Sequence, residues 1–380
     1  TLKSIGDNAF FCCEKLESIV IPDSVTHIGI GAFFGCVSLK SVAIPSGITS
    51  ISDSTFFRCR SLASVTIPKG VTSIGTNAFF GCAGLTEITI PEGVTTIGDN
   101  AFGGISESEL SMNLTSISLP NTLKRIGDSA FSGCTKLESI VIPDGVTHIE
   151  RGAFSDCKSL KSITIPSGMT VIDAWTFFRC ESLASVTIPD SVTKIGENAF
   201  DGCTALKDVY FLGTKDAWRN VPIGSENEPV TENAAIHYFS KWTQEKAPTC
   251  TESGTEKSTC SESDCSKTFV RTLPALGHDW DEGKVTKQPT ATETGVRTYT
   301  CTRCGDAYTE ELIPTVAVNL QVGGSYTFTT ANADITETAD ASIVSVSVRA
   351  NAAGYSRVTS VSEGRYLLVC NGSLLTTNSS

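Results

Sequence analysis

The feature that most constrains the fold of this chain is a proline, preceded by Ile or Leu, that recurs every 23 residues with one longer step of 29. The eight prolines stand at positions 22, 45, 68, 91, 120, 143, 166 and 189. A fixed period of this length is typical of a solenoid, in which each repeat forms one coil and buries its apolar side against the next. Each 23-residue unit is therefore expected to fold as one coil of a stack.

The idealised unit reads L-x-S-[IV]-x-I-P-x-x-V-T-x-I-G-x-x-A-F-x-x-C-x-x. Its first six positions predict a strand, because β-branched residues alternate with short polar ones, and the proline ends the strand because it has no N–H to donate. V-T-x-I-G predicts a second short extended segment, and A-F-x-x-C is long enough only for a 3₁₀-like turn. The prediction is a mainly β solenoid with a parallel sheet, short returns and 3₁₀ turns, followed by small β-rich modules.

Fixed apolar positions become columns when the units stack. One column consists of Phe10, Phe33, Phe56, Phe79, Phe102, Phe131, Phe154, Phe177 and Phe200. Three residues after these rings, eight units carry Cys13, Cys36, Cys59, Cys82, Cys134, Cys157, Cys180 and Cys203. Cysteines on coils about 4.8 Å apart are within reach of a disulfide. We favour buried apolar filling instead, because Ile105 takes the place of Cys in the fifth unit.

The array has two irregularities and an ending. Residues 137–211 repeat residues 16–90 at an offset of 121, and extra residues between Ile105 and Leu114 predict a surface loop. Beyond Val209 the pattern decays, and Trp218 with a polar tail is expected to close the apolar end of the stack. Because the first residues already match the middle of a unit, we expect the chain to be a fragment of a longer protein.

Charge and motifs narrow the function classes. The formal net charge is −12 and no Lys/Arg cluster opposes it, so no nucleic-acid partner is expected. No run approaches the roughly 20 apolar residues that cross a bilayer, so we expect no direct membrane insertion. The chain has no G-x-S-x-G, no H-E-x-x-H and no phosphate-binding Gly loop, and its carboxylates are scattered. We therefore predict no catalytic residues and no enzyme activity.

Residues 240–314 differ from the array, because they are poor in Leu and Ile and consist of two related halves. PTCTESG at 248–254 is echoed by PTATETG at 289–295, and a pair of cysteines follows in each half. The predicted domains are therefore a solenoid with a C-terminal cap at 1–239, a Cys-containing two-half small β module at 240–314, and a β-sandwich-like module at 315–380.

The first half offers metal ligands. Cys250, Cys260, Cys265 and His278 together supply the three thiolates and one imidazole of a closed structural zinc site. The second half has Ala291 in place of the first Cys and no later His. Local disulfides and free thiols therefore remain open alternatives to zinc, and no other cofactor is expected.

The signature IP…VTxIGxxAFxxC and the ending GTKDAW…IG…IHY resemble the BspA-like leucine-rich repeats over residues 1–239. The resemblance implies a bacterial surface or secreted protein that attaches to host proteins or to other cells. It implies no catalytic residues.

Candidate binding residues come from the strand positions that alternate with buried ones, because they repeat across the sheet. Small hydroxyl side chains there leave a smooth face that offers donors and acceptors to a peptide, a glycan or a protein surface. Short side chains also suit tightly stacked strands without any ligand. The candidates are Ser18, Ser41, Ser64, Thr66, Glu87, Thr89, Ser116, Ser139, Ser162, Thr164, Ser185, Thr187, Asp208 and Tyr210.

Three functions fit the sequence. The favoured one is a non-catalytic extracellular or cell-surface scaffold that binds protein or glycan partners on host or bacterial surfaces. The second is the non-catalytic accessory region of a larger secreted hydrolase. The third is an architectural stalk that extends a distal binding head.

Overall fold

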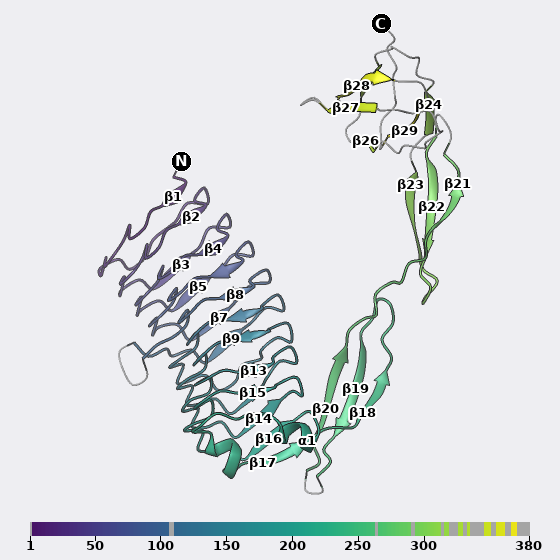
Figure 1. The fold of residues 1–380 in the computed structure, drawn as a ribbon. Helices are drawn as coiled ribbons and strands as arrows, with labels where there is room; N and C mark the ends of the chain where they lie inside the picture. Colours follow the sequence, from purple (N-terminus) through teal and green to yellow (C-terminus); the bar gives the residue numbers. More distant parts are fainter. Residues whose placement is uncertain are drawn as a thin grey trace. The chain divides into compact units, whose positions relative to one another are not determined.

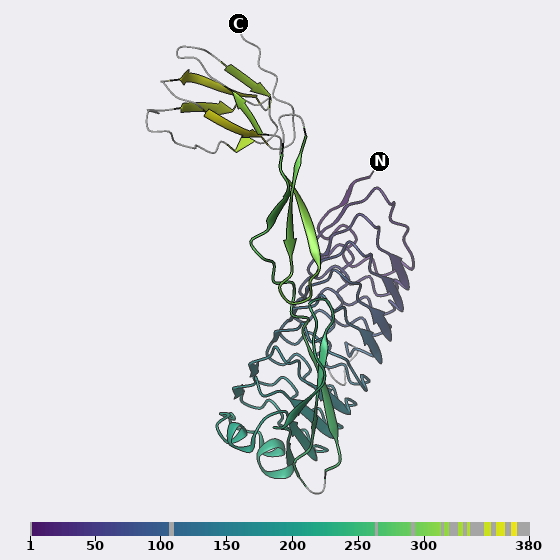
Figure 2. The same ribbon diagram turned by 90° about the vertical axis from the view of Figure 1, so that its right-hand side faces the viewer.

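The computed structural model describes residues 2–105, 110–262, 265–289 and 293–312, and beyond them residues 315–318, 326–329, 333–334, 346–350, 355–361 and 366–370. The chain divides into two compact units, residues 1–243 with 257–270 and residues 244–256 with 271–380. In the first unit, successive coils stack in chain order from the N-terminus to the cap (Figures 1 and 2).

Most coils contribute two short strands, and like positions pair in parallel register, as Ser41 with Ser64 and Ile74 with Ile97 do. The strands before the prolines are β3(Ser41–Ala43), β5(Ser64–Thr66), β7(Glu87–Thr89), β9(Ser116–Ser118), β12(Ser162–Thr164), β14(Ser185–Ile188) and β16(Asp208–Phe211). The V-T-x-I returns are β1(Ser4–Ile5), β2(His27–Ile28), β4(Ser50–Ile51), β6(Ser73–Ile74), β8(Thr96–Ile97), β10(Arg125–Ile126), β11(His148–Ile149), β13(Val171–Ile172) and β15(Lys194–Ile195). The predicted solenoid of parallel strands is confirmed.

The phenylalanine column is the centre of the core. Its nine rings, from Phe10 to Phe200, stack face to face with centroids 5.1–5.7 Å apart. From Phe33 to Phe200 the rings are fully buried. Each ring therefore contacts only the coils above and below, which is why stability in such an array grows with the number of neighbours.

The cysteine column is buried from Cys36 onward, Cys13 at its end is exposed, and its thiols are unbridged. Each Sγ from Cys36 onward donates to the carbonyl of the Phe on the preceding coil, for example Cys82 to Phe56 at 3.1 Å. The cysteine is thus more than apolar filling, because it satisfies a buried carbonyl. Burial raises the pKa of the Cys82 thiol to about 12, so the thiol stays neutral.

The place of the missing cysteine in the fifth unit is taken by Met112 and not, as the sequence suggested, by Ile105. Met112 is fully buried and pairs with Cys134, whereas the Ile105 side chain is 51 % exposed. The extra residues change which side chain enters the core at this position. The long, flexible thioether of Met112 fills the buried space there. Residues 106–109 of the predicted loop lie outside the described residues.

The corner after the Phe is built from turns with i to i−3 hydrogen bonds, such as Cys36 N to Phe33 O at 3.2 Å. This agrees with the 3₁₀-like turns predicted. Most corners contain two residues in the left-handed conformation, which suits Gly and Asn but strains bulky side chains, and the first of these in each corner forms a column. This column is Asn8, Gly31, Ser54, Asn77, Asn100, Ser129, Gly152, Trp175 and Asn198. Trp175, with φ of 64°, is the exception in it.

A short helix and a further strand lie at the C-terminal end of the stack. Helix α1(Lys215–Arg219) begins after Thr214, whose side chain accepts a hydrogen bond from Ala217 N at 3.1 Å. Trp218 is buried and its ring centroid lies 5.1 Å from that of Phe211. After the single π-turn η1(Pro229–Asn233), strand β17(Ala235–Tyr238) pairs in parallel with β16 as an additional rung.

Small sheets follow the solenoid, as predicted. The first has the order β18(Trp242–Lys246), β19(Gly254–Thr259), β20(Thr268–Leu273), and the second, which is antiparallel, β21(Lys284–Lys287), β22(Gly295–Thr300), β23(Ala307–Leu312). Two further antiparallel sheets have the orders β24(Thr315–Val318), β29(Tyr366–Cys370), β26(Ala333–Asp334) and β25(Tyr326–Thr329), β28(Tyr355–Val361), β27(Val346–Ala350). Among the residues described, no helix has both the length and the apolarity to span a bilayer.

Candidate binding surfaces and cysteine–histidine clusters

The predicted face of the sheet is exposed from Ser18 to Thr164. The alternation is plain in β7, where Glu87 and Thr89 are exposed and Ile88 between them is buried. Two valines at equivalent places of the duplicated blocks, Val20 and Val141, are 92 % and 83 % exposed. Apolar side chains this open on a sheet face add contact area to an otherwise hydroxyl-rich surface.

A shallow hollow of about 910 Å³ lies on this face over β5, β7 and β9. Its lining includes Pro68 and Pro91, which border the strands, and Lys69 and Glu92, which add one charge of each sign. Five of the predicted candidates also line it, namely Ser64, Thr66, Glu87, Thr89 and Ser116.

The face does not extend to its predicted C-terminal end. Thr187 and Tyr210 are only 6 % and 5 % exposed. Phe269 of β20 lies 5.7 Å from Tyr210 between ring centroids, and the Lys267 ammonium lies 4.0 Å from the Tyr210 ring. A segment from beyond the array therefore covers Tyr210, and the expectation that Thr187 and Tyr210 face solvent is wrong.

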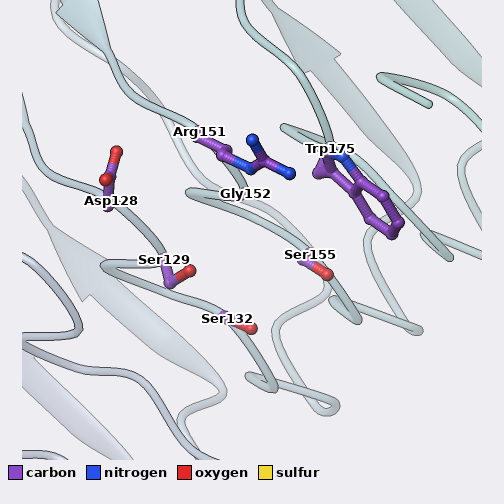
Figure 3. Close-up of a pocket in the computed structure, with 7 residues that line it drawn as sticks. All are labelled: Asp128, Ser129, Ser132, Arg151, Gly152, Ser155 and Trp175. Carbon is purple, nitrogen blue, oxygen red and sulfur yellow. The ribbon is translucent and has the colours of Figure 1, made fainter. Parts of the chain in front are cut away.

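A second hollow, of about 290 Å³, lies at the corners of the coils and was not predicted from the sequence (Figure 3). Asp128, Ser129, Ser132, Arg151, Gly152, Ser155 and Trp175 line it. The Arg151 guanidinium lies toward the Trp175 ring, 5.7 Å from its centroid.

The cause of this hollow can be traced in the sequence. In the first coils a second phenylalanine follows each core ring, and Phe11, Phe34, Phe57 and Phe80 stack with centroids 4.5–5.2 Å apart. Ser132 and Ser155 occupy the same place in later coils. Two missing phenyl groups leave the space, and the signal that could have found it is the change from A-F-F to A-F-S.

The four predicted zinc ligands do not form one group. Cys250 and His278 lie with Cys301 and Cys304, and we call these four residues the Cys250 cluster. Cys260 and Cys265 lie with His237 instead, and we call these three the His237 cluster. Within each cluster the ligand atoms are all within 4.8 Å of one another.

The Cys250 cluster is held by backbone pairing of three segments. Leu276 N and Gly277 N donate to the carbonyls of Thr249 and Cys250, at 2.8 and 3.1 Å. Asp279 N donates to Cys301 Sγ at 3.4 Å. The Sγ atoms of Cys250 and Cys301 are 3.7 Å apart, and Cys304 Sγ is 3.4 Å from His278 Nδ1.

The Cys301 thiol is poised to ionise. Its burial raises the pKa, but backbone N–H groups of Asp279, Arg303 and Cys304 outweigh burial and, with His278, lower the pKa to about 5. A thiolate is the form that binds metal.

In the His237 cluster, the imidazole is oriented by a carboxylate. His237 Nε2 lies 2.9 Å from Asp208 Oδ1, which leaves Nδ1 facing Cys260 Sγ at 3.9 Å. Histidine ligands of metals are commonly held in this way by a second hydrogen bond.

Comparison with known proteins gives the family. The model for the BspA type leucine rich repeat region matches residues 3–112 and 107–220. The chain belongs to this family, whose repeats are generally non-catalytic scaffolds. No curated protein sequence matches the chain.

Solved leucine-rich repeat structures are also similar. A protein from Bacteroides ovatus is 31 % identical, with 59 % of this chain and 64 % of that one covered and a TM-score of 0.45. A leucine rich cell surface protein from Faecalibacterium prausnitzii is 34 % identical, covering 58 % and 72 % with a TM-score of 0.34. The match thus spans less than two thirds of the Bacteroides chain.

Proposed function

We propose that this chain is a non-catalytic interaction scaffold at the cell surface or outside the cell, and that it binds a protein or glycan partner through the exposed sheet face. The observation that carries the proposal is the hollow over β5, β7 and β9, lined by hydroxyl groups of three adjacent coils. The partner is sought on host or bacterial surfaces.

The chemistry of the face supports an extended polar partner. Ser and Thr hydroxyls both donate and accept, so Ser64, Thr66 and Thr89 present a two-dimensional grid of hydrogen-bonding groups. The strands are short and parallel, and their side chains lose little conformational entropy on contact because they are small. Broad faces of this kind are how solenoids bind.

The test is binding of the full chain to immobilised host matrix proteins, to a glycan array and to whole bacterial cells. The double variant Thr66→Arg with Thr89→Arg places two bulky charges in the hollow and should weaken binding at least tenfold. The matched control is Thr72→Arg with Thr95→Arg, which puts the same change on exposed return positions of adjoining coils. Equal binding by both variants would remove the sheet face from the proposal.

The accessory-region and stalk hypotheses predict different outcomes. For an accessory region of a larger secreted hydrolase, the complete reading frame would encode a catalytic domain. For a stalk, deletion of one 121-residue block would leave the affinity of the parent protein unchanged. Loss of affinity on that deletion favours binding by the array itself.

A second candidate function is sugar binding in the hollow at Trp175. Sugar rings stack on aromatic faces and hydrogen-bond to planar charged groups, and this hollow offers an indole, a guanidinium and the Asp128 carboxylate. Trp175 Nε1 has no hydrogen-bond partner among the described residues. Trp175→Ala should abolish any glycan-array signal that the Thr66 and Thr89 variant retains.

A further inference from the structure

We propose that Cys250, His278, Cys301 and Cys304 bind one Zn²⁺ ion, and that the metal joins the two three-stranded sheets β18–β20 and β21–β23. This inference goes beyond the proposed binding function, because it concerns how the region after the array is built.

The interatomic distances fit a tetrahedral ion. With Zn–S of about 2.3 Å and Zn–N of about 2.05 Å, the edges of a zinc tetrahedron measure about 3.8 Å between sulfurs and about 3.5 Å between sulfur and nitrogen. The observed values are 3.7 Å for Cys250 Sγ to Cys301 Sγ and 3.4 Å for Cys304 Sγ to His278 Nδ1. A disulfide would require about 2.05 Å.

The backbone around the pair Cys301 and Cys304 has the form that a tight metal loop needs. Gly305 directly after it is left-handed, with φ of 80°, and its N–H donates to the Cys301 carbonyl at 2.9 Å. Arg303 within the loop donates to the carbonyl of Leu276 at 2.9 Å and lies 3.8 Å from Asp279. Three thiolates around Zn²⁺ carry a net charge of −1, which this guanidinium offsets.

The histidine is also held in place. The His278 ring stacks on Trp280 with centroids 4.6 Å apart, and Trp280 packs edge-on against Tyr308 of β23. Ligands whose orientation is set by neighbouring groups bind metal with less loss of freedom.

The repeat explains why ligands come from both halves. His237 and His278 are 41 residues apart, and so are Cys260 and Cys301. The backbone contacts repeat as well, because Ser261 N donates to Tyr238 O at 3.1 Å as Thr302 N donates to Asp279 O at 2.8 Å. Each histidine thus lies beside the pair of cysteines that follows it in the sequence, His237 beside Cys260 and Cys265 and His278 beside Cys301 and Cys304, and Cys250 is added to the second group from the first half.

This arrangement explains how the second half can complete a zinc site although it has Ala291 in place of the first Cys. Cys250 of the first half completes the site of the second half, so that site needs no cysteine at position 291. A cysteine there could complete only the site of a further copy of the repeat. The first half has no cysteine 41 residues before Cys250, where Val209 stands in the array. We therefore assign the complete donor set to the Cys250 cluster.

The experiment is elemental analysis of the full chain, purified under reducing conditions without chelator. Cys304→Ser and His278→Ala should each contain one zinc ion per chain fewer than the unaltered protein. Cys12→Ser, at an exposed cysteine outside both clusters, should lose none. Zinc content that is the same in all four proteins would overturn the proposal, as would iron in place of zinc.

Substitution of a ligand can unfold a small module, so a second measurement uses the unaltered chain. Titration with Co²⁺ should produce the thiolate-to-cobalt charge-transfer and ligand-field absorption of a tetrahedral site. Cys304→His, which retains a ligand, should restore part of the signal that Cys304→Ser loses. Absence of these bands, or a Cys250–Cys301 disulfide found by mass mapping of the reduced-purified chain, would contradict the assignment.

Discussion

The array and the small modules after it are stabilised in opposite ways. From Phe33 to Leu206 every coil buries a Phe and a Leu, and all but one also bury a Cys, between neighbouring coils. Among the described residues from 240 to 312, the only buried apolar side chains are Cys250 and Cys301, and both belong to the Cys250 cluster. A region with so small a core needs a cross-link to fold, whereas each coil of the array is stabilised by packing against neighbouring coils.

The largest effect should come from metal removal, which separates the two regions. Structural zinc contributes about 10–16 kcal/mol of apparent binding free energy in small domains, so chelation should unfold β21–β23. Hydrogen exchange measured by mass spectrometry should then show loss of amide protection in residues 284–312 and no change in residues 27–211. Unchanged protection in both regions after verified zinc loss would mean that the module has a sufficient core of its own.

A matching disruption of the array is Phe79→Ala, in the middle of the ring stack. Loss of a fully buried ring costs about 3–5 kcal/mol of unfolding free energy. Urea denaturation followed by circular dichroism measures this cost. The control is Phe11→Ala, at an end position where the ring is 52 % exposed. If the two variants lost the same stability, continuous stacking would not be what holds the array.

The cysteine column tests a smaller contribution. Cys82→Ala leaves the Phe56 carbonyl without its thiol donor and should cost about 1–3 kcal/mol, while Cys82→Ser, which keeps a donor, should cost less. Thermal or urea unfolding distinguishes the two. Equal losses would show that only the volume of the sulfur matters.

The same thiol has a pH signature. Its pKa is about 12 in the folded chain, against about 8.5 for an unfolded cysteine, so its contribution is complete below pH of about 8.5 and declines above it. The stability difference between the unaltered chain and Cys82→Ala should therefore shrink on titration from pH 8 to 11. A difference that stayed constant would mean that the thiol ionises equally in both states.

The smallest effect concerns the one bulky residue in the left-handed corner column. Trp175→Asn introduces the residue type found at the same place in four other coils, as Asn8, Asn77, Asn100 and Asn198. Because Asn tolerates the left-handed conformation better than Trp, the substitution should raise the unfolding free energy by about 1 kcal/mol. The same substitution removes one wall of the second hollow. A stability gain with loss of glycan binding would show that the strain is retained for function; a loss of stability would show that indole packing outweighs the strain.

The array was predictable because its information is local and repeated. Phe and Cys at fixed places in 23-residue units leave one way to stack, so columns and parallel register followed from spacing. The failures lie where the period breaks. Because of the insertion, the sequence did not show that Met112, and not Ile105, enters the core. The residues of β16 likewise gave no indication that Phe269 covers Tyr210.

The small modules after the array show most clearly what could not be predicted from the sequence. The sequence by itself determined that cysteines and histidines recur in two related halves, and that zinc is a chemistry open to them. Only the tertiary structure decided the grouping, in which His278 lies with Cys301 and Cys304 while His237 lies with Cys260 and Cys265. The physical reason is that ligands are chosen by distance in space, and each histidine lies beside cysteines 23 or more residues away through backbone pairing that no local pattern encodes.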